Sequence, residues 1–140
     1  MLYKYIEQCG KKEFQWGTFD CCTFACDWAI KLGKNDPMHE LRGKYKTALG
    51  ALRLLKKISG ADSIRDITDF CDADGTAFHR VPKEEVGRGD VVIVSGIPFG
   101  GDGAHMDCSM GICVGDVCAV ASEKGVVYVN RMHIVMGWND

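Results

Sequence analysis

The chain has 140 residues, 46% of them hydrophobic and 26% charged, with a formal net charge of −2. These values are typical of one folded domain, here residues 1–140, and they exclude disordered and collagen-like chains. The balanced charge offers no broad basic surface, and no apolar run approaches the roughly 20 residues of a membrane helix, so we expect neither nucleic acid nor membrane as a partner. The first five residues carry no secretory pattern, so we expect synthesis in a reducing cytosol.

The first half of the sequence predicts helices. Four segments have helical spacing or end signals: Leu2–Cys9, Cys21–Leu32, Thr47–Ser59 and Ser63–Phe70. Asp20 is a favourable N-cap for the second of them. Gly33 and Gly60 stand where the second and third segments should end, because a left-handed residue commonly closes a helix.

The second half predicts strands. The four segments are Val91–Val94, Ser109–Val114, Val117–Ser122 and Val126–Asn130. Gly115-Asp116 predicts a two-residue turn, which would bring Cys113 opposite Cys118. Because helices and strands are segregated along the chain, we expect an α+β fold in which N-terminal helices pack on a C-terminal antiparallel sheet.

Cys21 is the strongest candidate for a reactive side chain. It follows Asp20 in the run W-G-T-F-D-C-C, which begins at Trp16, and falls in the first turn of a predicted helix. Free N–H groups and the helix dipole stabilise a thiolate at such a position, so Cys21 is a candidate nucleophile. The alternative is a buried cysteine that fills space at a helix end.

Several short motifs resemble those of the NlpC-type cysteine peptidases. That family has D-C-S-G at its nucleophile, followed by G-D-L-V, H-V-G-I-Y-I-G and I-H-A-S on later strands. This sequence has, in the same order, D-C-C-T from Asp20, G-D-V-V from Gly89, S-M-G-I-C-V-G from Ser109 and A-V-A-S from Ala119. The resemblance covers most of residues 14–130. It implies a papain-like α+β core with Cys21 in the place of the nucleophile.

A closer resemblance is to small phage and prophage tail proteins that are distantly related to these peptidases. Their shared motifs are W-G-x-x-D-C-C, a helix ending in D-W, G-x-D-P, R-G-x-Y and an Ala-rich helix. The matching segments are Trp16–Cys22, Asp27-Trp28, Gly33–Pro37 (one residue longer), Arg42–Tyr45 and Thr47–Leu55. The resemblance implies a structural or assembly component of a tail tip. Such a chain is made in the host bacterial cytoplasm, is located in the virion and binds other tail-tip or hub proteins.

The same resemblance leaves the catalytic base unaccounted for. A cysteine peptidase needs a group that takes the thiol proton and later protonates the leaving amine. The family's histidine falls on Ser109, whose hydroxyl is no base at neutral pH, and its orienting residue falls on Val120, or on Ala121 without a one-residue gap. His105 is the candidate substitute, although an extended strand would place it about 13 Å from Ser109.

The remaining candidates for the acid–base role are weaker. Asp107 shares the predicted face of Ser109 but has no histidine to orient, and His133 follows the last predicted strand. We assign no role to His39 and His79. The sequence therefore favours a scaffold that has lost its base. The alternative is an active peptidase that cleaves the peptide cross-links of peptidoglycan during phage DNA entry.

A metal site is a further alternative, although we expect no metal and no cofactor. Four cysteines would converge if the second helix packed on the Gly115-Asp116 hairpin: Cys22, Cys26, Cys113 and Cys118. Four thiolates bind zinc or an iron–sulfur cluster. No two cysteines have the C-x-x-C spacing of most structural zinc sites, so these residues also fit buried thiols of a reduced protein.

Overall fold

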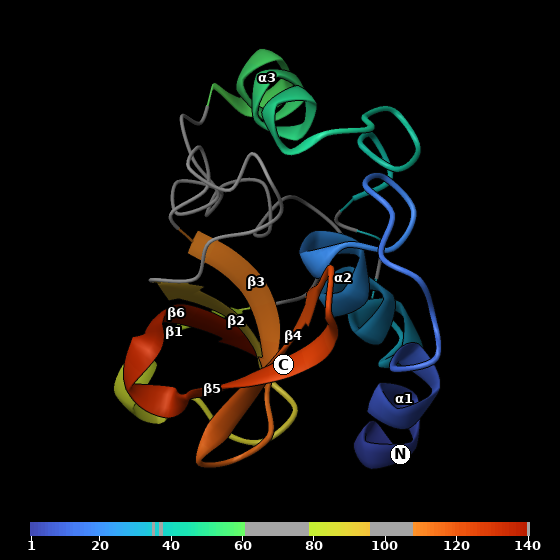
Figure 1. The fold of residues 1–140 in the computed structure, drawn as a ribbon. Coiled ribbons are helices and arrows are strands. Elements are labelled where there is room, and N and C mark those ends of the chain that lie inside the picture. Colours follow the sequence, from blue (N-terminus) through green and yellow to red (C-terminus); the bar gives the residue numbers. More distant parts are fainter. Residues whose placement is uncertain (35, 37, 61–78, 96–107, 140) are drawn as a thin grey trace.

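The computed structural model describes residues 1–34, 36, 38–60, 79–95 and 108–139. Within these residues the chain forms three α-helices and a six-stranded antiparallel sheet (Figure 1). The helices are α1 (Leu2–Cys9), α2 (Cys21–Lys31) and α3 (Ala48–Ser59). The strands are β1 (His79–Val81), β2 (Val91–Ser95), β3 (Cys108–Cys113), β4 (Val117–Ser122), β5 (Gly125–Asn130) and β6 (Ile134–Asn139). The predicted α+β class is confirmed.

The sheet has the order β1-β6-β2-β3-β4-β5. Each strand pairs antiparallel with its neighbours, and the last strand returns to lie between β1 and β2. Every residue of β3 is buried, and so are the first four residues of β2, as the continuous apolar run predicts. These two strands therefore form the centre of the core.

Helix α2 lies against the curved sheet and α1 lies beside α2, whereas α3 lies apart from the sheet (Figure 1). The contacts of α2 are with β2, β3 and β4. Its partner α1 is held by Tyr5, whose ring stacks on Phe24 with 5.7 Å between centroids and whose hydroxyl donates to the Phe24 carbonyl at 2.5 Å. The start of α2 is thus fixed between a second helix and the middle of the sheet.

Local signals set the ends of the helices. Thr47 caps α3, because its Oγ1 accepts a hydrogen bond from the backbone N–H of Gly50 at 2.9 Å. Gly60 closes the same helix in the left-handed conformation, with φ of +78°. Asp20 caps α2 as predicted.

The sequence analysis missed two strands, β1 and β6. It placed the last strand at Val126–Asn130, whereas a 3-10 helix follows and leads into β6. Gly137 weakens the strand pattern there, but a Cβ at this position would lie 2.6 Å from Cγ2 of Val86, which precedes β2, so the close approach of this side chain favours glycine. The predicted helix Ser63–Phe70 lies outside the described residues. Among those that are described, no helix is long and apolar enough to span a bilayer.

Candidate functional site

The buried carboxylate of Asp20 organises the start of α2. Its Oδ1 accepts a hydrogen bond from Thr23 N at 2.9 Å, and the Thr23 hydroxyl in turn accepts from Asp20 N at 2.7 Å. Its Oδ2 accepts from Gly17 N at 2.9 Å and from the Tyr45 hydroxyl at 2.5 Å. The side chain is fully buried, and these three donors compensate the loss of its hydration.

Cys21 is the first residue of α2, as predicted, and it is fully buried. Its sulfur lies 3.8 Å from that of Cys22. The hydrogen bond with Cys21, together with burial, raises the pKa of the Cys22 thiol well above its ordinary value. The Cys22 thiol is therefore neutral at pH 7, and both cysteines at this helix end are buried.

The loop before α2 and the segment after it are locked together. The Gly43 N–H donates to the Gly17 carbonyl at 2.9 Å, and a Cβ on Gly17 would collide with the Tyr45 carbonyl oxygen. Burial and the nearby Cys22 and Asp20 raise the pKa of Tyr45 far above its ordinary value, so the phenol stays a donor. The W-G-x-x-D and R-G-x-Y motifs are therefore two halves of one hydrogen-bonded unit.

Arg42 joins α2 to the segment that follows it. Its Nη2 lies 2.6 Å from Asp27 Oδ1, and its Nε donates to Asp36 Oδ2 at 2.6 Å. Partial burial opposes the charge of the guanidinium, but the bonds to both carboxylates raise its pKa above the ordinary value. The two aspartates of the D-W and D-P motifs thus bind one arginine.

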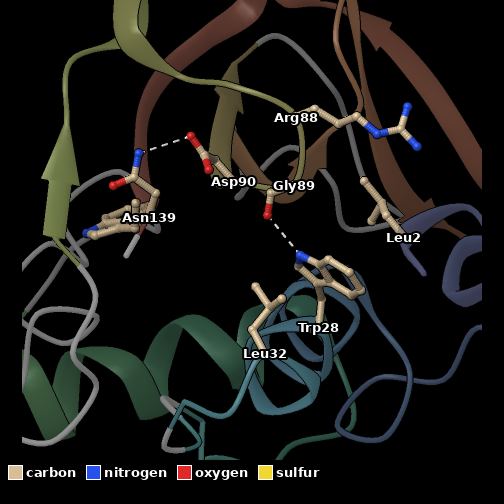
Figure 2. A pocket seen from close by; sticks show the side chains of 8 residues that line it. Leu2, Trp28, Leu32, Arg88, Gly89, Asp90 and Asn139 are labelled. Atoms are coloured by element: carbon tan, nitrogen blue, oxygen red, sulfur yellow. Dashed lines mark hydrogen bonds between the residues drawn. The ribbon is translucent and has the colours of Figure 1, made fainter.

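Trp28 connects α2 to the sheet at a shallow pocket of about 300 Å³ (Figure 2). Its indole Nε1 donates to the Gly89 carbonyl at 2.8 Å, and Asn139 Nδ2 donates to Asp90 Oδ2 at 3.3 Å on the other side of the pocket. The remaining lining residues are Leu2, Leu32, Arg88 and Trp138. The G-D motif therefore anchors a tryptophan, which is a structural use of residues that the family resemblance singled out.

The positions that correspond to the base and its orienting residue are buried inside the sheet. Ser109 lies in β3 opposite Val94, and within the described ranges its hydroxyl has no hydrogen-bond partner. Val120 lies in β4 opposite Val127, and Ala121 lies opposite Val126. None of these three side chains accepts a proton at neutral pH, so β3 and β4 supply no base.

The histidines divide into two groups. His39, His79 and His133 are exposed, and none of these three forms a hydrogen bond with Cys21. His39 lies 3.8 Å from Glu40, and His133 ends a 3-10 helix. His105, the candidate substitute base, lies outside the described residues, and so does Asp107. In the described part of the chain, therefore, no imidazole accompanies the candidate nucleophile.

The four cysteines considered as a metal site do not form one cluster in the described part of the chain. Cys113 and Cys118 face each other across the β3–β4 hairpin, as predicted, whereas Cys22 contacts Cys21. Over the described ranges, no three His, Cys, Asp or Glu side chains gather in a metal-binding group. The four thiols thus do not form the site that the alternative required.

The fold and the site define a small α+β protein with a buried cysteine at a helix N-terminus, held by a capping aspartate. The chain belongs to the family described as a domain of unknown function, DUF6950, which matches residues 1–139. No curated protein and no solved structure matches the chain.

Proposed function

We propose that this protein is a structural or assembly component of a bacteriophage tail tip, with an NlpC-like core that lacks a complete catalytic triad. The tail-tip context rests on the motif resemblance, above all on Trp16–Cys22 and Arg42–Tyr45. The resemblance assigns the base and orienter positions to Ser109 and Val120. The proposed loss of catalysis rests on one observation about them, which is that both side chains are buried.

The NlpC-like core is part of the proposal. In that family the nucleophile begins a helix and its base stands on a following strand. Here Cys21 begins α2, and α2 contacts β3, the strand that carries Ser109. The order of the elements supports the same arrangement.

The hydrogen bonds of the motif residues support a structural role. Asp20 receives three donors, Arg42 binds two carboxylates and Trp28 is bonded to the backbone of Gly89. A catalytic group must be free to exchange protons with a substrate, whereas these polar groups are occupied by bonds within the fold. We infer that their shared purpose is to hold one rigid shape, as a binding partner in an assembly requires.

The second candidate function is the active peptidoglycan peptidase. The position of Cys21 at the N-terminus of α2 favours it, because free N–H groups there stabilise a thiolate. This function requires a base that comes from His105 or from another protein. It also requires an opening at Cys21, whose side chain is buried.

The proposal is tested in the phage or prophage that encodes the chain. The gene is deleted and then complemented with the wild type, with Cys21→Ala or with Gly17→Ala. We expect the first two to restore the same plaque titre and to appear in purified tails by mass spectrometry, because the assembly needs the shape and not the thiol. The Gly17→Ala control should be absent from the particles, because it disrupts the loop that packs on Tyr45.

Two results would contradict the proposal. If the wild-type chain is missing from purified particles, the protein is not a tail component. If Cys21→Ala is incorporated normally but the titre falls to that of the deletion strain, the thiol acts chemically and the peptidase function stands.

A further inference from the structure

The β3–β4 hairpin brings two cysteines into direct opposition. Cys113 and Cys118 are register partners. The backbone hydrogen bonds of Cys113 are formed on the side of β3 that faces away from β4. Its N–H donates to the Asp90 carbonyl at 2.9 Å, and its carbonyl accepts from Gly89 N at 2.7 Å. Cys113 and Cys118 are thus a non-hydrogen-bonded pair, with Cα atoms about 4.5 Å apart. This separation lies inside the range of roughly 4.4–6.8 Å found in disulfides.

The surroundings make the two sulfurs unequal. Arg131 Nη1 donates to Cys113 Sγ at 3.6 Å and to the Gly115 carbonyl at 3.2 Å, which holds the guanidinium against one sulfur. Burial, reinforced by the neighbouring Cys113, raises the pKa of the Cys118 thiol to about 12. The Cys113 sulfur receives this N–H donor, and its own S–H donates to the Gly115 carbonyl at 3.5 Å, so we assign the first attack to Cys113.

We propose that Cys113 and Cys118 are a redox-active pair that forms a cross-strand disulfide on oxidation by hydrogen peroxide. Cys113 gives its proton to solvent, and its thiolate attacks one peroxide oxygen; the O–O bond breaks and hydroxide leaves, taking a proton to become water. The Cys118 sulfur then attacks the Cys113 sulfenic acid. The S–O bond breaks, and the oxygen leaves as a second water with the thiol proton. Two thiols lose two electrons, and one peroxide becomes two waters.

The oxidant must be small, because both sulfurs are buried. The pair closes a hairpin in which the turn residue Asp116 and the adjacent Val117 of β4 are exposed, so opening of this single turn admits a molecule of nearly the size of water. In a reducing cytosol the pair stays a dithiol, and outside the cell the disulfide locks β3 to β4. This inference does not depend on the proposed tail-tip function.

The other close pair lacks the required geometry. Cys21 and Cys22 are adjacent in sequence, and their sulfurs lie 3.8 Å apart. The Cα atoms of adjacent residues are held about 3.8 Å apart by a trans peptide, which is shorter than disulfides tolerate without distortion. We therefore expect oxidation to join Cys113 to Cys118 and to leave Cys21 and Cys22 unlinked.

The test uses the folded full-length protein. It is treated with hydrogen peroxide, then denatured and alkylated, and digested without reduction by a protease that cleaves before aspartate. Cleavage before Asp116 separates the two cysteines, so their peptides stay together only if a disulfide joins them. We expect one disulfide-linked species. Its mass should be the sum of the two thiol peptides minus two hydrogen atoms, and reduction should split it into those peptides.

A pair of variants assigns the linkage. Cleavage before Asp107 and Asp116 leaves Cys108 in the same peptide as Cys113, so Cys108→Ser is the matched control and should retain the linked species. Cys113→Ser should abolish it. Two results overturn the proposal: both thiols of the wild type are still alkylated after peroxide treatment that oxidises free cysteine, or the linked species persists in Cys113→Ser.

Discussion

Asp20→Ala is expected to lower the free energy of unfolding by about 3–5 kcal/mol, which is a large part of the stability of a domain this size. The change removes the cap of α2 and leaves the Gly17 N–H and the Tyr45 hydroxyl without their acceptor inside the fold. Each buried group that loses its partner costs about 1–3 kcal/mol. Urea denaturation followed by circular dichroism measures the change.

Two control variants separate the parts of this effect. Tyr45→Phe removes one donor and keeps the cap, so we expect a smaller loss of about 1–2 kcal/mol. Glu7→Ala changes an exposed carboxylate on α1 and should stay within about 0.5 kcal/mol of the wild type. If Asp20→Ala also stayed within that margin, Asp20 would not be the centre of the site's structure.

Gly17→Ala is expected to destabilise the fold by about 3 kcal/mol or more. Gly17 has a φ of +91°, and its added methyl group would collide with the Tyr45 carbonyl oxygen. A backbone oxygen cannot move aside without moving the chain, so the loop must separate from the segment after α2. The thermal midpoint of unfolding measures this effect.

Gly33→Ala is the matched control for this substitution. Gly33 has a similar φ of +86°, but nothing lies within 4 Å of the position of its added Cβ. Gly33→Ala should therefore lower the free energy of unfolding only by the cost of an alanine at positive φ, about 1–2 kcal/mol. Equal losses of stability in Gly17→Ala and Gly33→Ala would mean that the close approach of Gly17 to Tyr45 does not contribute to the effect.

Short-range signals account for what the sequence predicted well. Asp20 before a helix, Gly60 after one and Gly115-Asp116 between two strands act through neighbouring residues, so their effects can be inferred from the sequence alone. The turn also fixed the register of the hairpin, which is why the opposition of Cys113 and Cys118 could be predicted.

Long-range contacts account for what the sequence missed. The cap Asp20 was predicted, but its partner Tyr45 lies 25 residues away and no local pattern connects them. Strand β6 was missed because its place between β1 and β2 is decided by pairing across the sheet. The burial of Cys21 likewise depends on how α2 packs on β2, β3 and β4, which is a property of the whole fold.

We propose that Cys21 has no catalytic role. The most direct measurement is the release of soluble fragments from peptidoglycan of the host, analysed by mass spectrometry after incubation with the wild type, Cys21→Ala or Cys22→Ala. The account predicts the same chromatogram for all three proteins, without peptide products. Peptide fragments released by the wild type and by Cys22→Ala, but not by Cys21→Ala, would contradict it and identify the protein as a working peptidase.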